Sequence, residues 1–323
     1  MIEAVRTNVQ LARAYLYDFA RYRRFSFVNR SVSRGNRRAI IRIFTHYLEG
    51  GMAFPDVRLG YGQDKAGSIM KKIESYHADF GVDETVLWAV ATLRSYIDYH
   101  IEKGQRLSEL EQQFERLTQT IGTLDDTYPG GAEQVNATQI RAAAMIDFES
   151  FLRHRHSVRQ YAPGPVDDDT IARIVRNAQQ CPSVCNRQTC KVYALNDVAR
   201  VQAALTYQAG NAGFRQEIQT VFVVTSNMSE MNLVGERYQG WIDGGIFAMT
   251  LALAVHAEGL GACFLNWSVE PAQDRALRRH LGIPDDELVI TMMSAGHLKK
   301  AFSVPVSDRK PLSEVLTLNQ RVS

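Results

Sequence analysis

The period of the hydrophobic pattern changes near the middle of this chain, and that change limits the folds available to it. Over roughly the first 120 of its 323 residues, apolar side chains recur every three or four positions, as on one face of a helix. The second half contains three strand-like runs rich in branched apolar residues, at residues 190–195, 220–226 and 288–296. A long apolar helix is expected between the last two, from about residue 238 to residue 258. Helices and strands do not alternate as regular βαβ units, so the pattern predicts an α+β fold and not a doubly wound sheet.

The helices expected in the first half have recognisable apolar faces and ends. Two of the faces consist of Val5, Val9, Ala12, Leu16 and Phe19, and of Ile40, Ile41, Phe44, Tyr47 and Leu48. Gly50 and Gly51 are expected to break the second of these helices. Asp83 is placed to cap a further helix, and Ser108 with Glu111 has the spacing of a capping box that opens another.

Turn-forming residues at 125–131 (DDTYPGG) separate this helical region from the rest of the chain. We therefore predict two domains, a helical N-terminal extension over residues 1–130 and a second domain over residues 131–323. The second domain is expected to begin with one helix over about residues 139–155. A further helix is expected to start at residues 167–169, where three aspartates follow a proline-containing extended stretch.

Composition places the chain among globular proteins of a reducing compartment. With 45% apolar and 22% charged residues it can bury a substantial core. No stretch approaches the roughly 18 uninterrupted apolar residues of a membrane span, and the N-terminus lacks the apolar segment of a secretory signal. Four cysteines are too few for a disulfide framework in a chain of this length. We therefore expect a cytoplasmic protein without a membrane span.

The N-terminal arm is locally basic. Residues 1–45 contain ten arginines but only two acidic residues, Glu3 and Asp18. Such a patch can attract nucleic acid, an anionic membrane surface or an acidic small substrate, or it can be a solvated face partly paired with acids elsewhere in the fold. No nucleic-acid-binding motif accompanies the charge, so nucleic acid is not expected as a partner.

Three of the four cysteines, Cys181, Cys185 and Cys190, fall within ten residues of one another. No second pair of Cys or His follows them at a zinc-like interval, and they form no CxxC motif. We therefore expect neither a metal site nor a dithiol redox couple. Between them, residues 183–188 carry a dense row of side chains that form hydrogen bonds, and this row is expected to face a ligand.

Motifs that occur in order over residues 150–316 resemble those of the FMN-dependent nitroreductases. RHSVR at residues 155–159 is similar to the phosphate-binding stretch of that family, and PSVCNRQ at residues 182–188 is similar to its flavin-binding segment. Thr189 and Cys190 stand where the family usually has Pro-Trp. Cys190 is therefore expected to leave extra room near the cofactor or to be covered by the N-terminal helices.

The resemblance continues downstream of these two motifs. Further similar stretches are AGN with FR within residues 209–215, GLGA with LNW within residues 259–267, LGIP at residues 281–284, Gly296, and SDRKP at residues 307–311. The resemblance implies a nitroreductase-like fold, in which a central, mostly antiparallel sheet is flanked by helices.

The resemblance also implies which residues bind FMN. They are Arg155, His156, Ser157, Arg159 and Arg309 at the phosphate end, and Pro182, Ser183, Val184, Asn186, Gln188, Arg215, Asp243, Leu265 and Asn266 around the ring system. Guanidinium groups bind phosphate oxygens through paired hydrogen bonds, and amide side chains can pair with the donors and acceptors of the flavin edge. A surface ion pair is the alternative for each arginine, and a structural role is the alternative for His156. No catalytic side chain is predicted.

The activity implied is that of an FMN oxidoreductase. NAD(P)H would reduce the flavin, and the flavin would reduce or oxidise a small substrate such as an anionic or sugar-nucleotide metabolite. No GxGxxG motif occurs, so no Rossmann crevice for the pyridine nucleotide is predicted. The resemblance also implies a homodimer with FMN at the interface and a C-terminal arm, about residues 311–323, that reaches over the partner.

The N-terminal region lies outside the common nitroreductase fold. Residues 46–52 and 55–62 resemble the extension of a subgroup associated with bacterial polysaccharide biosynthesis. His46 and Glu49 lie one helical turn apart and could serve a pocket, although a paired polar face is the favoured interpretation. Two alternatives to such an enzyme remain: a flavin-binding or flavin-consuming protein without a second substrate, and a basic helical binding module on a degenerate reductase fold.

Overall fold

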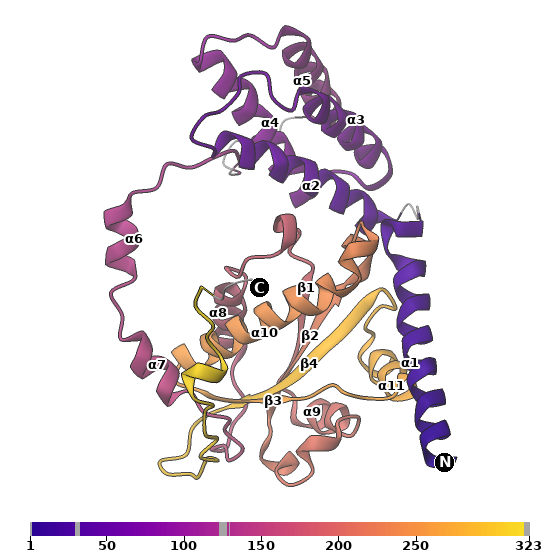
Figure 1. The fold of residues 1–323 in the computed structure, drawn as a ribbon, viewed down its shortest axis with the longest axis vertical. Helices are drawn as coiled ribbons and strands as arrows, with labels where there is room; N and C mark the ends of the chain where they lie inside the picture. The colour runs from indigo at the N-terminus through magenta and orange to yellow at the C-terminus, as the bar shows by residue number, and fades with distance from the viewer. Residues whose placement is uncertain (1, 30–32, 123–127, 129, 320–323) are drawn as a thin grey trace.

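The computed structural model describes residues 2–29, 33–122, 128 and 130–319. Helices at the N-terminal end form one region, and a sheet flanked by helices forms the other (Figure 1). The turn at residues 125–131, where the domain boundary is expected, lies largely outside the described residues.

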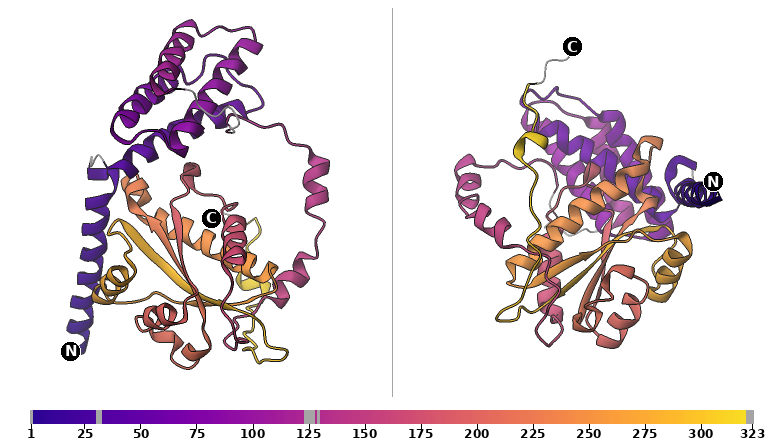
Figure 2. Two further views of the ribbon diagram at one scale, coloured as in Figure 1. Left: turned by 180° about the vertical axis from the view of Figure 1, so that it is seen from behind. Right: turned by 60° about the horizontal axis from the view of Figure 1, so that its bottom comes forward.

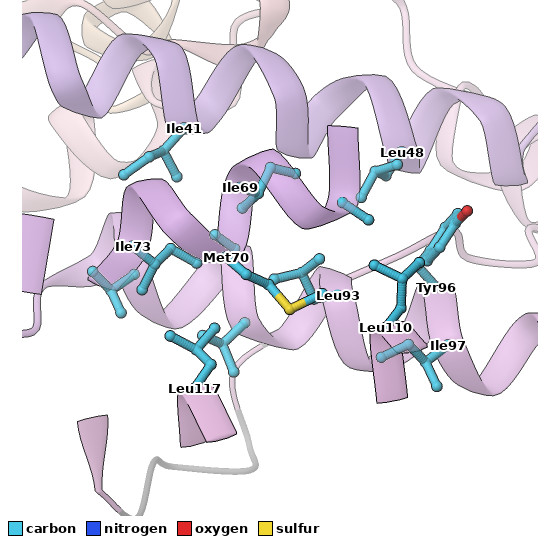
Figure 3. Packing of buried hydrophobic residues seen from close by; sticks show 14 of the residues in the cluster. Ile41, Leu48, Ile69, Met70, Ile73, Leu93, Tyr96, Ile97, Leu110 and Leu117 are labelled. Carbon is cyan, nitrogen blue, oxygen red and sulfur yellow. The ribbon is translucent and has the colours of Figure 1, made fainter. Parts of the chain in front are cut away.

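Four helices of the N-terminal region pack around a common hydrophobic core. They are α2 (Arg34–Met52), α3 (Gln63–Phe80), α4 (Glu84–Glu102) and α5 (Ser108–Ile121). Figure 3 shows side chains from all four helices meeting in this core, among them Ile41, Ile69, Leu93 and Leu117, each 0% exposed. The helical period predicted for the first half is therefore confirmed, and its apolar positions bury the surface that stabilises the bundle.

Helix α2 continues through Gly50 and Gly51, so the expected break at these residues is wrong. Gly51 lies against the ring of Tyr61, and a Cβ atom at this position would be 2.1 Å from Tyr61 Cε2. Gly51 is therefore required by close packing within a helix and not by a turn. No atom lies within 4 Å of a Cβ atom added at Gly50.

The two predicted helix caps have different outcomes. Asp83 caps α4 as expected, because its side chain accepts hydrogen bonds from the first backbone amides of the helix. The capping box of Ser108 and Glu111 is only half correct. Ser108 is already the first residue of α5, and the carboxylate of Glu111 accepts a hydrogen bond from the amide of Leu107 at 3.0 Å.

Helix α1 (Ile2–Phe25) runs away from the bundle and along the sheet region (Figures 1 and 2). It contacts that region through polar groups: Tyr17 Oη donates to Asp274 Oδ2 at 2.7 Å, and Arg21 Nη2 donates to the carbonyl oxygen of Glu287 at 2.7 Å. The helix is confirmed, but its apolar face is not part of a core. The exposed fractions on that face are 58% for Val5, 44% for Val9, 64% for Leu16 and 62% for Phe19.

The second region is built on a four-stranded antiparallel sheet in the order β1-β2-β4-β3. The strands are β1 (Cys190–Leu195), β2 (Thr220–Asn227), β3 (Gly261–Leu265) and β4 (Glu287–Gly296). The three strands predicted from branched apolar runs are confirmed as β1, β2 and β4. β3 was not predicted as a strand, because its five residues include glycine and cysteine and form no branched apolar run.

Helices cover both faces of this sheet (Figure 2). Helices α8 (Asp168–Ala178) and α10 (Gln239–Ala257) pack on one face, and α9 (Val198–Leu205) and α11 (Pro271–Leu281) pack on the other. Successive residues of β2 alternate between the two cores: Val221 and Val223 belong to the core with α9 and α11, whereas Phe222 belongs to the core with α8 and α10. The expected α+β arrangement is confirmed, as are α8 and α10.

The single helix expected over residues 139–155 is wrong. The chain instead forms two short helices, α6 (Ala137–Ala143) and α7 (Phe148–His154), which pass along the outside of the molecule (Figure 1). Asp147 ends the intervening turn by accepting a hydrogen bond from the amide of Ser150. Neither helix has a buried residue, so no packed face holds the two helices in one line.

One helix of the described residues, Val234–Ala257, is long and apolar enough to cross a membrane by length and composition alone. Its main part is α10, and half of the apolar window is buried. Phe247, Leu251 and Val255 pack on the sheet, as in the core helix of a globular domain.

Alanine substitutions at the two neighbouring glycines of α2 should have opposite effects. Gly51→Ala should lower the free energy of unfolding by about 1–3 kcal/mol, because the new methyl group overlaps the Tyr61 ring. Gly50→Ala should raise it by about 0.5–1 kcal/mol, because alanine favours helix and the site is open. Urea unfolding followed by circular dichroism measures both variants. Equal effects at the two positions would contradict the packing role of Gly51.

Candidate functional site

The predicted phosphate-binding segment, residues 155–159, lies along the start of β3. Ser157 forms a parallel bridge with Ala262, and the amide of Val158 donates to the carbonyl oxygen of Ala262 at 2.9 Å. A side chain at Gly261 would meet Val158 at 2.9 Å, so the glycine permits this close approach. The backbone of the segment is therefore fixed relative to the sheet.

Arg155 and Arg159 form no ion pair with a carboxylate of the described residues. Arg159 lies over the ring of Phe214, with 5.9 Å between its Cζ atom and the ring centroid. Burial raises the pKa of the Cys263 thiol in β3, while the charges of the two arginines oppose that rise. Both arginines therefore lie near this strand. Among the described residues neither of them forms the surface ion pair that is the alternative to phosphate binding.

A small cavity of about 50 Å³ lies beside this segment, lined among others by Arg155, His156 and His256. Burial lowers the pKa of His256, whose Nε2 atom is 3.0 Å from the carbonyl oxygen of Phe151. Arg155 adds to that lowering. His256, which sequence reasoning did not identify, thus lies near Arg155, and its pKa is held below the ordinary value of a histidine.

A chain of hydrogen bonds joins Arg215 to Asn266. Arg215 Nε donates to Asn211 Oδ1 at 2.5 Å, Asn211 Nδ2 donates to Gln208 Oε1 at 2.9 Å, and Gln208 Nε2 donates to the carbonyl oxygen of Asn266 at 2.9 Å. Arg215 directly follows Phe214, whose ring lies under Arg159, so Arg215 is close to the phosphate segment. The side chain of Leu265 instead packs in the core and is 3% exposed, which leaves only its backbone available to a ligand.

The predicted flavin segment, residues 182–188, has an unusual backbone. Cys185, Asn186 and Gln188 have φ angles of 48°, 48° and 53°, which is a left-handed backbone conformation that residues other than glycine rarely adopt. Ser183 Oγ closes the turn by accepting a hydrogen bond from the Gln188 amide at 2.9 Å. Such strain persists only where surrounding contacts impose it, and it often marks a functional segment.

Asp243 of α10 supplies one of those contacts. Its Oδ2 atom accepts a hydrogen bond from the amide of Val184 at 3.3 Å, and its Oδ1 atom accepts one from Gln239 Nε2 at 2.8 Å. Asp243 is 2% exposed. Within one chain, Asp243 therefore helps to position residues 182–188.

Arg187 supplies the other main contact, and its expected orientation toward a ligand is wrong. The side chain is 0% exposed and forms a two-point ion pair with Glu236, at 2.6 and 3.0 Å, and a hydrogen bond to the carbonyl oxygen of Glu230 at 2.7 Å. Burial opposes ionisation of Glu236, but hydrogen bonds from Arg187 and from two backbone amides hold its pKa below the ordinary value. Sequence gives no signal for this pairing, because Arg187 and Glu236 are far apart along the chain.

The N-terminal region also contacts the flavin segment. Arg42 of α2 donates from Nη1 to the carbonyl oxygen of Arg187, and the same atom lies 4.0 Å from Glu230 Oε2. Asn36 Nδ2 donates to the carbonyl oxygen of Ser229. Burial raises the pKa of Glu230, and Arg42 opposes that rise. Helix α2 is therefore part of the support of residues 182–188.

A cavity of about 780 Å³ lies between the two regions at this point. It is lined by Arg38, Arg42, Glu49, Glu84, Trp88, Tyr128, Gly130, Gly131, Ala132, Glu133, Gln179, Asn186 and Gln188. Gln188 Nε2 donates to Asn186 Oδ1 at 3.0 Å, so the two predicted ring-edge amides are bonded to each other at its wall. This cavity combines residues of the predicted flavin segment with residues of the N-terminal helices.

The predicted site residues fall into two groups in one chain. The small cavity beside Arg155 is lined by Ala252 and His256 of α10, whereas Ser183 and Gln188 share a second small cavity with Asp243, nearer the start of that helix. Ala252 is nine positions after Asp243, or about 13.5 Å along a helix. Neither of these two cavities is lined by residues of both groups.

Arg309 joins neither group through a contact among the described residues. It is exposed, and its guanidinium donates only to the carbonyl oxygens of Ser307 and Asp308 in its own C-terminal arm. The single chain therefore does not bring Arg309 to Arg155 and Arg159 through a hydrogen bond or an ion pair.

The three clustered cysteines are free thiols around this segment. Burial, with smaller contributions from Asp243 and Cys181, raises the pKa of Cys190 to about 12, so its thiol is protonated at neutral pH. Cys181 and Cys190 line a cavity of about 60 Å³ with Ser183 and Asp243, which agrees with the extra room expected beside Cys190. Within the described ranges, no three His, Cys, Asp or Glu side chains are grouped so that they could hold a metal ion.

Comparison with known proteins identifies a family similarity in the second region. Two overlapping stretches, residues 152–212 and 198–297, match the model of the Nitroreductase family. A protein of Archaeoglobus fulgidus named for NADH dehydrogenase/NAD(P)H nitroreductase activity is 26% identical over 151 residues, which are 45% of this chain and 82% of that protein.

Solved structures give a similar result. A Desulfovibrio desulfuricans protein crystallised with FMN and described as a nitroreductase is 22% identical with a TM-score of 0.47, and the alignment covers 55% of this chain and 99% of that one. An FMN-dependent nitroreductase of Clostridium difficile is 20% identical with a TM-score of 0.45, over 53% of this chain and 98% of that one. The match of residues 152–212 and 198–297 to the Nitroreductase family model gives the fold of this region. That match confirms the expected nitroreductase-like fold and an oxidoreductase enzyme type for residues 152–297.

Replacing Cys181, Cys185 and Cys190 together by serine should leave the fold intact. The expected loss is roughly 1–3 kcal/mol of unfolding free energy, because small buried groups change and no metal ligand is removed. Circular dichroism, flavin content and elemental analysis measure the result. Stoichiometric zinc in the wild-type protein, together with unfolding when a chelator is added, would identify the thiols as ligands.

Proposed function

We propose that this chain is an FMN-dependent oxidoreductase in which bound FMN supplies two-electron transfer between NAD(P)H and a small polar substrate. The observation that carries the proposal is that Arg155 and Arg159, which form no ion pair among the described residues, are held beside β3 by a fixed backbone segment. They occupy the positions of the phosphate-binding residues in the motif that this sequence resembles.

The chemistry of these residues fits the phosphate of FMN. That phosphate is a dianion, and a guanidinium group keeps its charge at every physiological pH while it offers paired donors to the oxygens. Backbone pairing with Ala262 fixes where Arg155 and Arg159 leave the chain, so little ordering is required when the anion binds. Arg215 adds a third cation next to Phe214, which packs under Arg159.

The strained segment fits the ring system. Asn186 and Gln188 offer amide donors and acceptors of the kind that match a flavin edge, and their mutual hydrogen bond would be exchanged for bonds to the ring. Asp243 and Arg187 hold the backbone of the segment in place. No side chain is assigned a proton-transfer role.

We further propose a homodimer with FMN at the interface. The phosphate group and the ring-edge group line separate cavities toward opposite ends of α10 in one chain, which is compatible with a site that two copies share. Helix α10 also leaves an apolar stripe at Ile242, Ile246 and Met249, with 53%, 40% and 40% exposure at intervals of four and three residues. Packing against a second copy would cover this stripe, and the apolar C-terminal arm would reach over the partner.

The alternative of a basic binding module is not favoured. Arginines of the N-terminal arm pair with carboxylates inside the fold: Arg21 with Asp274, Arg34 and Arg38 with Asp83, Arg37 with Asp79, and Arg42 with Glu230. Five of the ten arginines of the arm are therefore in ion pairs within the fold, as in a structural role.

The electron donor, the cofactor, the cellular location and the substrate class are each supported by a different observation. The names of the relatives support NAD(P)H as the electron donor and FMN as the cofactor. A cytoplasmic location agrees with four free cysteines. An anionic or sugar-nucleotide substrate and a place in polysaccharide biosynthesis are supported by the resemblance of residues 46–62 to one nitroreductase subgroup.

The purified protein is expected to release FMN, and not FAD, on denaturation. Under anaerobic conditions NAD(P)H should bleach the flavin absorbance, and addition of an electron acceptor should restore it. Chromatography of the released flavin and stopped-flow absorbance measure these steps. FAD, or no flavin after reconstitution, would exclude this cofactor assignment; binding without bleaching would favour a flavin-binding protein that turns over no second substrate.

Single alanine substitutions at Arg155, Arg159 and Arg309 should each weaken FMN binding by about 1.5–3 kcal/mol, the scale of a charge-assisted hydrogen bond. Arg153→Ala is the matched control, because Arg153 pairs with Glu149 on the surface of α7, two residues before the segment. Fluorescence titration of the flavin-free protein measures the affinities. If all three variants bind FMN like the control, these arginines do not contact the phosphate.

A further inference from the structure

We propose that the cavity of about 780 Å³ between the N-terminal helices and residues 182–188 binds the second substrate, and that this substrate is a hydroxyl-bearing metabolite with a phosphate or carboxylate group. This inference rests on the proposed function, because it assumes that Asn186 and Gln188 lie at the edge of the flavin. It gives the N-terminal helices, which lie outside the family match, a part in substrate recognition.

The size and position of the cavity suit such a ligand. A volume of this order accommodates small-molecule ligands, for which sites of about 300–1,000 Å³ are usual. Asn186 and Gln188 line one wall, whereas Arg38 and Glu49 of α2 and Trp88 of α4 come from the N-terminal bundle. A ligand in this space would therefore contact the flavin segment and the N-terminal helices at once.

Arg38 is the cation that remains available to a ligand. Its Nε atom donates to Thr85 Oγ1 at 3.1 Å and lies 4.0 Å from Asp83 Oδ2, but its two terminal nitrogens have no hydrogen-bond partner among the described residues. Its side chain is 28% exposed. The neighbouring Arg42, by contrast, already bonds the carbonyl oxygen of Arg187 and lies near Glu230. Paired donors on Arg38 match the oxygens of a phosphate or carboxylate.

Glu49 provides the acceptor. Its Oε1 atom accepts hydrogen bonds from Trp88 Nε1 at 2.7 Å and from Thr92 Oγ1 at 3.1 Å, and its Oε2 atom is 3.5 Å from His46 Nδ1. The favoured interpretation of His46 and Glu49 as a paired polar face therefore agrees with the structure, yet Glu49 also lines the cavity. A carboxylate has about four acceptor sites, so Oε2 can still accept a hydrogen bond from a ligand hydroxyl.

Arg38, Glu49 and Trp88 indicate the class of substrate through the interactions that each side chain can form. A neutral ligand forms no charge-assisted hydrogen bonds with the open terminal nitrogens of the partly exposed Arg38, whereas a phosphate or carboxylate does, so an anion is expected to bind more tightly. Glu49 repels an anion close to it but favours a hydroxyl or amine. Trp88, oriented by its bond to Glu49, offers a flat apolar wall. A simple apolar nitroaromatic or quinone offers neither an anionic group to Arg38 nor a hydrogen-bond donor to Glu49.

The test uses the full-length, FMN-loaded protein and isothermal titration calorimetry with three probes: glucose 1-phosphate, glucuronate and glucose. Both anions should bind the wild-type protein, and the tighter of the two identifies the preferred acid group. Arg38→Gln should weaken anion binding about tenfold or more, the scale of a lost charge-assisted hydrogen bond. Glucose should bind the wild-type protein about as weakly as the anions bind this variant.

Arg37→Gln is the matched control, because Arg37 is the preceding residue of α2 but pairs with Asp79 and lines a different cavity. It should leave anion binding unchanged. Circular dichroism and flavin content show whether the variants are folded and loaded.

Equal anion affinity in the Arg38→Gln and wild-type proteins would overturn the inference, as would failure of both anions to bind. An equal loss of anion affinity in the Arg38→Gln and Arg37→Gln variants would also overturn it, because the loss would then reflect overall charge and not a contact with Arg38. Flavin absorbance separates this outcome from failure of the proposed function. If no FMN loads, the proposed function fails, and the same titrations on the flavin-free chain still decide whether Arg38 binds an anion in this cavity.

Discussion

A buried guanidinium holds together the part of the molecule on which the candidate site depends. Arg187 is fully buried, and removing one partner of such an ion pair typically costs about 3–5 kcal/mol. Its contacts with Glu236 and with the carbonyl oxygen of Glu230 therefore fix the segment before α10 and the turn that follows β2 relative to each other. The same residue offers its own carbonyl oxygen to Arg42 of α2. This network holds residues 185–188 in a backbone conformation that would otherwise cost roughly 1–3 kcal/mol per strained residue.

Helix α10 organises the rest of the site. One side of it packs on the sheet through Phe247, Leu251 and Val255, and its first turns position the strained segment through Asp243. Its last turns lie beside the segment that carries Arg155. A rigid helix of this length keeps the two groups of predicted cofactor ligands apart within one chain. That separation is the physical argument for a site completed by a second copy.

The N-terminal region is more than an appended bundle. Its own core is closed, with Ile41, Ile69 and Leu93 fully buried, so it does not need the sheet region to bury its apolar surface. It nevertheless contributes Arg42 and Asn36 to the support of the flavin segment, and Arg38, Glu49 and Trp88 to the cavity above it. Five of the ten arginines in residues 1–45 form ion pairs within the fold. The N-terminal helices, which lie outside the residues matched by the family model, therefore form one side of this cavity.

The sequence by itself determined the elements whose signals are local. Branched apolar runs predicted β1, β2 and β4, the apolar period predicted α10, and Asp83 marked the start of α4, because backbone sterics and capping act within a few residues. The order of short motifs also indicated the fold and the cofactor class. Only the tertiary structure decided that Gly51 lies inside a helix against Tyr61, that residues 139–155 form two helices, and that the apolar face of α1 is exposed. It also decided that Arg187 is a buried ion-pair partner and that Arg38 and Glu49 share a cavity with Gln188. Each of these depends on groups brought together from distant parts of the chain, and local sequence patterns carry no information about such contacts.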